Sequence, residues 1–402
     1  MTRPIILNAF DMNCVTHIVS GTWRHPESQA ARYTDLSYWT ELAQLLERGL
    51  FDGLFIADVL GIYDVYGGGP QAAIRTGAQV PVNDPLLVVP AMAAVTKHLG
   101  FGVTVATSFE QPYPFARRMS TLDHLTNGRI GWNIVTGYLE SAARNHGHDT
   151  ITPHAQRYDI ADEFLDVTYK LWEGSWEDDA VGTEPGRAQY ADPTKVHPIG
   201  HDGRYFRVPG IHLSEPSPQR TPVLYQAGAS NRGRAFGATH GEVVFLTEPT
   251  LEGLRGTVAD IRRRARAAGR DPYDVKVVNG VSVVAAATDS EAQARLAEYR
   301  SYLDPEATLV LWSGWLGSDL ARFGLDDPVE LTDNEYLKSS VQAFGSGRWT
   351  LRDFVERRGR NARRCRLRRD GRGRTRALAR RERRRRLQHH EHDHAGQLRA
   401  GR

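Results

Sequence analysis

Polar and glycine residues follow directly after apolar segments of this chain, an arrangement that can bind a ligand. Residues 130–135 are mostly apolar or β-branched, and the preceding Asn127-Gly128 is typical turn sequence, so we expect a strand there. The residues that gather at its end are Asn133, Thr136, Gly137 and Tyr138. Asp58 ends the apolar segment 51–57 in the same way. Ligands bind at the carboxyl ends of strands in parallel α/β proteins, so these residues are candidates for a site.

A second candidate site follows the apolar segment 222–226. Gly228 and Ser230 offer backbone N–H groups and a hydroxyl at the start of a helix expected from about residue 231, with Arg232 and Arg234 nearby. This chemistry suits a phosphate, although an ordinary turn with a serine cap explains the same residues. No Gly-x-Gly-x-x-Gly follows a strand and no Walker motif is present, so a nicotinamide-dinucleotide or ATP fold is not indicated.

Short apolar strands alternate with amphipathic helices through most of the chain, which predicts repeated βα units and a parallel sheet. The expected strands are residues 5–10, 51–58, 101–106, 130–135, 222–226, 242–246 and 275–285. The expected helices are 36–48, 85–98, 114–125 and 159–172, with others beginning near 231, 250 and 289. Residues 174–220 are rich in Gly, Pro, Asp and His and form an expected insertion with a hairpin at 205–208. The prediction is an α/β fold of the TIM (β/α)8 type whose eighth strand is missing.

Composition excludes several classes of protein. With 40% hydrophobic and 25% charged residues the chain is neither disordered nor membrane-embedded, and it lacks the apolar run of about 18–20 residues that a spanning helix needs. The first residues do not resemble a signal peptide, so we expect a cytoplasmic protein. Cys14 and Cys365 are the only cysteines, which leaves neither a disulfide framework nor a zinc motif, and we expect no metal.

Charge is distributed unevenly along the chain. Residues 357–402 contain 19 Arg and four acids, about +15 in total, although the whole chain carries only +3. Residues 1–356 are therefore acidic, near −12. No Ile, Val, Phe, Tyr, Trp or Met follows Val355, so we expect residues 359–402 to be a disordered tail that cannot supply a buried strand.

Three hypotheses explain this tail. A nucleic-acid-binding arm would be salt-sensitive, and the irregular histidines at 389–394 could bind a metal. We favour a frameshift near residue 359. When residues 383–391 are back-translated with CGN arginine and CTN leucine codons and shifted by one base, Asp-Val-Asp-Gly-Phe-Asn-Ile-Met fits every position. That segment has the pattern of a strand ending in polar residues, and without it we expect the chain to be poorly stable or inactive.

Longer motifs give a specific resemblance over about residues 3–358. The segments that carry it are 8–12, 21–26, 55–58, 82–85, 120–125, 128–136, 157–159, 170–172 and 216–220, with 109–113 and 316–320 in addition. The sequence resembles the flavin-dependent monooxygenases of the bacterial luciferase-like superfamily. It is most similar to the branch that contains nitrilotriacetate, long-chain alkane and dimethyl sulfide monooxygenases. That family pattern ends with a strand containing Asp-Gly-Phe-Asn, which the shifted tail recovers.

The resemblance implies an FMN-binding TIM barrel in which specific residues contact the flavin. Carried over position by position, these are Asp58, Thr104, Asn133, Gly137, Tyr138, His154, Tyr158, Gly228 and Ser230. Ordinary structural roles remain open: Asn133 as a strand-end amide, Asp58 as a helix cap and His154 as a surface histidine. Tyr138 stands where the alkane enzyme has His, so acid–base work there is in doubt.

The resemblance also implies the reaction. Reduced FMN and O2 form a flavin C4a-(hydro)peroxide that oxygenates a small organic substrate, such as a sulfide or an alkane. The positions that line the substrate pocket in similar enzymes, and that we take as catalytic candidates, are Cys14, His17, Tyr63 and Gln79. Cys14 is equally explained as a small buried apolar residue. Because the chain has no nicotinamide motif, a separate NAD(P)H:FMN reductase is the expected partner of a homo-oligomer that binds neither membrane nor nucleic acid. The alternative function is a non-catalytic flavin- or deazaflavin-binding barrel.

Overall fold

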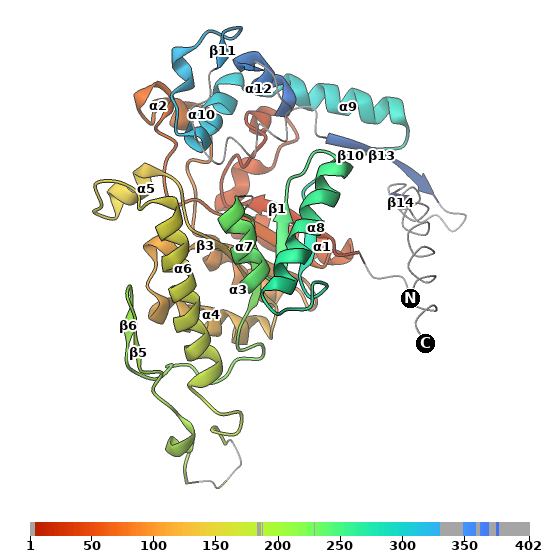
Figure 1. Cartoon of the computed structure of the whole chain (residues 1–402). Helices are drawn as coiled ribbons and strands as arrows, with labels where there is room; N and C mark the ends of the chain where they lie inside the picture. Colours follow the sequence, from red (N-terminus) through yellow and green to blue (C-terminus); the bar gives the residue numbers. More distant parts are fainter. Residues whose placement is uncertain are drawn as a thin grey trace, which may run out of the picture.

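The computed structural model describes residues 5–182, 186, 188–228, 230–329, 349–358, 362–369 and 375–377. Its centre is a sheet of seven parallel strands in the order β1-β2-β3-β4-β7-β8-β9 (Figure 1). The strands are β1 Asn8–Met12, β2 Gly53–Ala57, β3 Gly100–Ala106, β4 Ile130–Val135, β7 Val223–Gln226, β8 Val243–Leu246 and β9 Lys276–Asn279. All seven expected strands are present, and their order in space is their order in the chain, as repeated βα units require.

Helices connect the strands and cover the outside of the sheet (Figure 1). They are α1 Leu36–Arg48, α3 Val89–Ala94, α4 Pro112–Thr126, α6 His154–Tyr169, α7 Asn231–His240 and α8 Leu251–Ala267. Two other helices lie away from the outer face of the sheet: α5 Glu140–Asn145 at the upper left of Figure 1 and α9 Asp289–Ser301 at the upper right. Two predicted helices differ in length. The expected helix 85–98 splits into a 3-10 turn and the short α3, with Pro90 near the start of α3. Helix α6 begins five residues earlier than expected, directly after Pro153.

Aromatic side chains on the inner face show that the sheet is curled like a barrel wall. The ring of Phe10 on β1 lies 5.0 Å from the ring of Phe245 on β8, although four strands lie between β1 and β8 in the sheet order. Both rings also contact Phe55 on β2. Opposite them, a Cβ at Gly131 would lie 2.8 Å from the ring of Tyr225, so glycine there makes room for this ring. The barrel interior is therefore filled with packed rings.

The carboxyl ends of the strands lie beneath a layer of helices contributed by distant parts of the chain. This layer consists of α2 Gln71–Thr76, α10 Pro305–Leu316 and α12 Leu351–Arg358, at the top of Figure 1. Helix α10 is apolar on nearly all sides, because it packs against two separate clusters of buried residues. Among the described residues, no helix is both long and apolar enough to cross a membrane.

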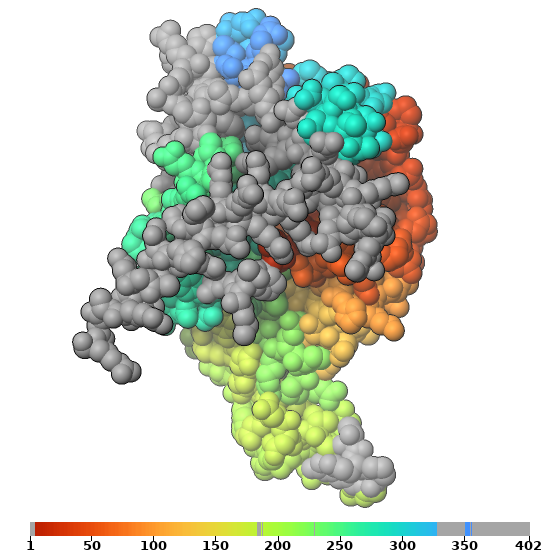
Figure 2. All heavy atoms as spheres, turned by 90° about the vertical axis from the view of Figure 1, so that its right-hand side faces the viewer, coloured from red at the N-terminus to blue at the C-terminus, as the bar shows by residue number. Residues whose placement is uncertain are grey.

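The predicted insertion projects from the opposite end of the sheet (Figures 1 and 2). Its hairpin pairs β5 His201–Asp202 with β6 Arg207–Val208. The expected hairpin at 205–208 is thus correct in place, but Tyr205 and Phe206 belong to the turn. Glu163 of α6 accepts hydrogen bonds from the backbone of this turn, at 2.8 Å from Phe206 N–H. The insertion therefore lies far from the carboxyl ends of the strands.

The described residues place no strand between β9 and β1. The expected strand 275–285 is divided into β9 and β10 Ser282–Ala286, and β10 leaves the main sheet. It pairs in parallel with β13 Ala362–Arg369, which pairs in turn with β14 Thr375–Ala377. These two strands differ from the disorder expected for the tail, because an open strand edge offers backbone hydrogen bonds to any sequence. The rest of residues 359–402 lies outside the described part of the chain.

Candidate active site

The candidate residues converge at the carboxyl end of the sheet, where five of the seven strands contribute to the site. Asp58 follows β2 directly, and burial raises its pKa to about 7, with the charge of Asp84 adding to the rise. Asp84 caps the turn after it by accepting from Leu86 N–H at 2.8 Å. None of the described helices has Asp58 as its cap, and Asp58 is a half-buried acid beside the strand end.

Cys14 lies in the loop after β1 as a buried thiol. Its Sγ donates to the carbonyl oxygen of Thr16 at 2.9 Å, and its backbone forms a bridge with Val82. Burial raises the pKa of Cys14 to about 12, and the charges of Asp11 and Asp58 raise it further. The thiol therefore stays protonated near neutral pH, so Cys14 can line a pocket but is a poor nucleophile.

His17, Gln79 and Tyr63 form a chain of hydrogen bonds, as their shared assignment to one pocket predicts. Gln79 Nε2 donates to the His17 carbonyl at 2.8 Å, and the Tyr63 hydroxyl donates to Gln79 Oε1 at 3.1 Å. Gln79 is buried and has a positive φ of 54°. Its amide lies between the loop that contains His17 and the loop that contains Tyr63. The His17 imidazole packs edge-on against Phe10 at 4.4 Å.

Tyr138 joins this chain from the other side. Its hydroxyl is hydrogen-bonded to the hydroxyl of Tyr63, although the family resemblance implies a flavin contact for Tyr138 and a substrate contact for Tyr63. Gly137, just before it, has a φ of 66°, the left-handed conformation that favours glycine and turns the chain after β4. The two predicted groups of residues therefore meet at this tyrosine pair.

Trp315 on α10 completes the cluster, and the sequence analysis did not identify it. Its indole N–H donates to both Tyr63 and Tyr138, at 3.2 Å from each hydroxyl oxygen. No local pattern marks this residue, because it belongs to an apolar helix more than 170 residues away from either tyrosine. Only the tertiary fold brings it to the site.

Asn133 and Thr104 are paired across neighbouring strands. They are opposite each other in the β3–β4 register, and Asn133 Nδ2 donates to Thr104 Oγ1 at 2.9 Å. Both side chains are buried, yet Asn133 Oδ1 has no hydrogen-bond partner among the described residues. Since buried polar atoms are normally paired, this oxygen is available to a ligand that donates a hydrogen bond.

The turn between β7 and α7 has the features of an anion site. Ser230 caps α7 and accepts from Gly233 N–H at 3.0 Å. A Cβ at Gly228 would lie 2.7 Å from the hydroxyl of Tyr158 and 2.9 Å from the Cα of Gly233, so only glycine fits. Burial raises the pKa of Tyr158, which therefore remains a neutral hydrogen-bonding group here. Ala229 lies outside the described residues.

The basic residues around this turn differ from the expectation. Arg232 is ion-paired with Asp159 and Asp162, and Arg234 pairs with Asp260. Arg157 is more available for an anion: it is 7% exposed, and its Nε lacks a hydrogen-bond partner in the described part of the structure.

Arg157 and His154, both on α6, lie close to Tyr158 of the same helix. Arg157 Nη1 donates to the carbonyl of Thr152 at 2.5 Å, and its charge acts against the rise in the pKa of Tyr158. His154 is exposed at the start of α6, with its ring 5.2 Å from that of Tyr158. Arg157 and His154 are therefore both close to Tyr158.

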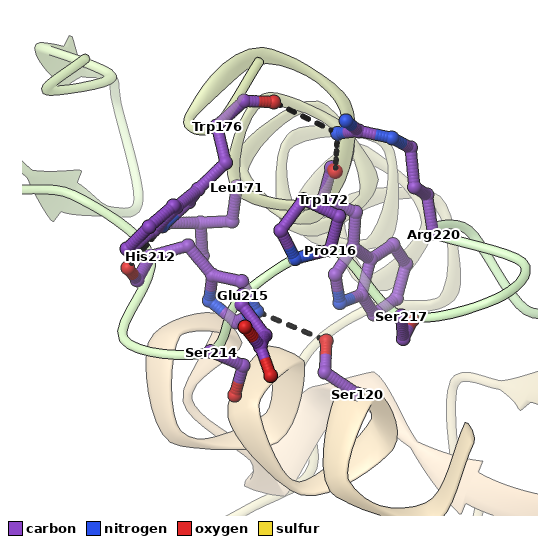
Figure 3. Close-up of a pocket in the computed structure, with 10 residues that line it drawn as sticks. All are labelled: Ser120, Leu171, Trp172, Trp176, His212, Ser214, Glu215, Pro216, Ser217 and Arg220. Carbon is purple, nitrogen blue, oxygen red and sulfur yellow. Dashed lines mark hydrogen bonds between the residues drawn. The ribbon is translucent and has the colours of Figure 1, made fainter. Parts of the chain in front are cut away.

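A small crevice at the other end of the sheet does not belong to this site. Figure 3 shows Ser120 facing His212, with Ser120 Oγ 2.9 Å from His212 Nε2. Burial lowers the pKa of His212 to about 4, so the imidazole is neutral. Arg220 is held by the carbonyls of Trp172 and Trp176. The crevice has no room for a water-sized sphere, so we interpret it as packing between α4 and the insertion. Among the described residues no cluster of side chains could hold a metal ion.

Comparisons with known proteins agree with this geometry. Residues 12–392 match the family model of the luciferase-like monooxygenases. The chain is 52% identical over 362 residues to a dimethyl-sulfide monooxygenase from Hyphomicrobium sulfonivorans, covering 89% of this chain and 75% of that protein. It is 56% identical over 329 residues to a long-chain alkane monooxygenase from Geobacillus thermodenitrificans, covering 82% and 75%.

Solved structures give the same result. The crystal structure of DmoA from Hyphomicrobium sulfonivorans matches with a TM-score of 0.83 and 52% identity, over 90% of this chain and 77% of that one. A riboflavin lyase solved with modified FMN and riboflavin matches with a TM-score of 0.80 and 38% identity, over 88% and 78%. Family, fold and the cluster at the strand ends agree, and the chain belongs to the luciferase-like monooxygenase family.

Proposed function

We propose that this protein is the oxygenase component of a two-component system, which uses reduced FMN and O2 to oxygenate a small organic substrate. The observation that carries the proposal is the orphaned buried oxygen Asn133 Oδ1, at the carboxyl end of β4, which has no hydrogen-bond partner among the described residues. A buried acceptor in this place suits a flat ring system that carries an N–H group. The relatives at 52% and 56% identity are named as monooxygenases of a sulfide and of alkanes.

The β7–α7 turn suits the phosphate of FMN. Gly228 lets the Tyr158 hydroxyl pack close to the start of α7, and the α7 N-terminus with Ser230 offers N–H and hydroxyl donors. Tyr158 adds a neutral hydroxyl, and Arg157 adds a buried positive charge. A charged guanidinium that is buried without a carboxylate partner is costly, and an anion would remove that cost.

Asp58, Thr104 and Gly137 surround the position proposed for the flavin ring. Thr104 fixes the Asn133 amide so that its oxygen faces the ring, and the turn at Gly137 leaves space beside β4. Reduced FMN, when bound, supplies the electrons that activate O2. The protein must then keep water out and orient the substrate, and the helices over the strand ends are placed to do so.

The substrate side is formed by Cys14, His17, Tyr63 and Gln79. The neutral thiol and the packed imidazole offer an apolar surface, while the Gln79 amide and the tyrosine hydroxyls offer a few fixed polar groups. This lining suits a small substrate with an apolar body, such as a sulfide or an alkane, which is the class named for the two relatives.

The partners follow from the chemistry. The chain has no dinucleotide motif, so reduced FMN must come from a separate NAD(P)H:FMN reductase. Such a system needs NAD(P)H, so we propose that the protein acts in the cytoplasm, and we propose that it is a homo-oligomer there.

Residues 359–402 form the Arg-rich tail. We propose that residues 1–358 are the catalytic barrel and that residues 359–402 are translated out of frame, replacing the strand that should lie between β9 and β1. Resequencing the gene decides this: an uninterrupted frame without a one-base slip would contradict it. Activity is therefore measured in the printed chain and, in parallel, in the chain with its frame restored.

The test of function is a coupled assay with NADH, FMN and a flavin reductase. Small sulfides, alkanes, sulfonates and aminopolycarboxylates are offered, and products are identified by mass spectrometry with 18O2. We expect one oxygen atom from O2 in the product and no product when reductase or O2 is omitted. Tight binding of oxidised FMN without turnover of any substrate would instead support the non-catalytic flavin-binding alternative.

A further inference from the structure

Helix α10 is connected to the site through one side chain. The Trp315 indole has a single N–H, which lies 3.2 Å from both the Tyr63 and the Tyr138 hydroxyl oxygens. Such a shared hydrogen bond fixes the two oxygens relative to each other and to the helix. The Trp315 side chain is partly buried. It packs against two hydrophobic clusters, one that contains Tyr63 and one that contains Leu351 of α12.

The direction of each hydrogen bond in this cluster can be assigned. Gln79 Nε2 donates to the His17 carbonyl, so Gln79 Oε1 faces Tyr63 and accepts its proton. A phenol has only one proton, so the Tyr63 oxygen must accept from Tyr138 and from Trp315. The order of donation is therefore Tyr138 to Tyr63 to Gln79, with Trp315 stabilising both phenol oxygens from the side.

Close packing keeps α10 in place above the pair. A Cβ at Gly314 would lie 2.7 Å from Tyr63 Cε1, so the helix touches the tyrosine ring with its backbone. Asp304 caps the helix by accepting from Ala307 N–H, and its own N–H donates to the carbonyl of Ser20 in the loop after β1. The position of Trp315 is thus set by contacts on both sides of the site.

We propose that Trp315 is a positioning residue for the reaction, acting through the Tyr63–Tyr138 hydroxyl pair to orient the substrate beside the flavin. This inference rests on the proposed function and adds a residue from outside the strand-end loops. Trp315 need not touch the substrate. Its hydrogen bond to the Tyr138 hydroxyl favours the rotamer of this 43% exposed side chain that faces Tyr63.

The test is a double-mutant cycle with Trp315→Phe and Tyr138→Phe in the full-length chain, in the printed and frame-restored forms. Phenylalanine keeps an aromatic ring at position 315 and removes only the N–H donor and one ring. We expect Trp315→Phe to lower kcat about tenfold and to change KM less than about threefold, because misplaced groups slow chemistry more than binding. We also expect more of the consumed O2 to be released as hydrogen peroxide.

The cycle separates positioning from packing. In the Tyr138→Phe background, Trp315→Phe should lower kcat by less than about threefold, because part of its effect acts through that hydroxyl. The matched control is Trp176→Phe in the insertion, far from the strand ends, where the indole N–H also donates a hydrogen bond, to the carbonyl of His212 at 2.9 Å. Its effect on kcat should be the same in both backgrounds. The free energy of unfolding in urea is measured for the same four proteins of the cycle, because this measurement does not require an active enzyme.

The outcomes distinguish this inference from the proposed function. No product from the unmutated chain with reduced FMN would overturn the proposed function. A productive chain in which Trp315→Phe and Trp176→Phe have equal effects, or in which the two substitutions of the cycle are additive in both kcat and unfolding, would overturn the role of Trp315.

Discussion

The hydroxyl groups of Tyr63 and Tyr138 are hydrogen-bonded to each other, joining the loop after β2 to the loop after β4 across 75 residues of sequence. Tyr63 is almost completely buried, at 1% exposed, whereas Tyr138 is 43% exposed. The pair therefore forms the boundary between the packed interior of the site and its open side, and its two members should contribute differently to stability.

Tyr63→Phe should destabilise the protein more than Tyr138→Phe. The first substitution leaves the buried Gln79 Oε1 without its donor, which costs about 1–3 kcal/mol. The second leaves that bond intact, so a loss below about 1 kcal/mol is expected. Urea unfolding of the two variants provides the comparison. Equal losses would show that the Tyr63–Gln79 bond contributes nothing beyond the tyrosine pair.

Gly228→Ala should impair both folding and FMN binding. The added methyl group would overlap the Tyr158 hydroxyl and the Gly233 backbone, so we expect a loss of about 1–3 kcal/mol and at least about tenfold weaker FMN binding. Gly256→Ala on the exposed face of α8 is the control, since nothing lies within 4 Å of its added Cβ. That change should stabilise the protein by about 0.5–1 kcal/mol. FMN fluorescence quenching and thermal unfolding measure both variants.

Arg157→Gln should discriminate between FMN and riboflavin. If the buried guanidinium neutralises the phosphate, its loss weakens FMN binding by about 10- to 100-fold, while riboflavin, which has no phosphate, changes less than about threefold. Arg129→Gln is the matched control, because Arg129 is a part-buried arginine held by the carbonyls of Ala93 and Leu99 at the amino ends of the strands. Equal weakening of both ligands by Arg157→Gln would place the charge away from the phosphate.

Asp58 should make the protein less stable as the pH rises from about 4 to about 7. Its folded pKa of about 7 lies above the unfolded value of about 3.9, so the folded state holds the extra proton in that range. Raising the pH therefore favours the unfolded state until both forms are ionised. Asp58→Asn should remove this loss, and the difference in melting temperature from the unmutated chain should grow up to about pH 7 and then level off. A difference independent of pH would show that Asp58 titrates normally.

The residues that sequence patterns predicted are those whose roles depend on local structure. Asn133 and Gly137 end a strand, and Ser230 precedes a helix, so periodicity and capping rules locate them. Trp315 could not be predicted in this way, because α10 is apolar on almost every side and its residues have no distinguishing pattern. The prediction that Arg232 is available to bind a phosphate was wrong for a related reason. Its ion-pair partners Asp159 and Asp162 come from a different helix, α6.

Restoring the reading frame should close the barrel and stabilise the protein. The sheet of described strands ends at β1 and β9, and Phe10 on β1 is 38% exposed although its ring already contacts β8. A strand with the pattern Asp-Val-Asp-Gly-Phe-Asn would pair with both edges and bury that ring, whereas an Arg-rich segment cannot be buried there. We expect the restored chain to gain soluble yield, to melt several degrees higher and to bind FMN more tightly than the printed chain.

The control for that prediction is the printed chain ended at residue 358, which removes the Arg-rich tail without adding a strand. If the tail only lowers solubility, truncation alone should recover yield and FMN binding to the level of the restored chain. If the barrel needs its last strand, truncation should leave FMN binding weak, because the edge strands β1 and β9 still lack a partner between them. DNA binding that is lost at high salt and on truncation would instead favour the nucleic-acid arm.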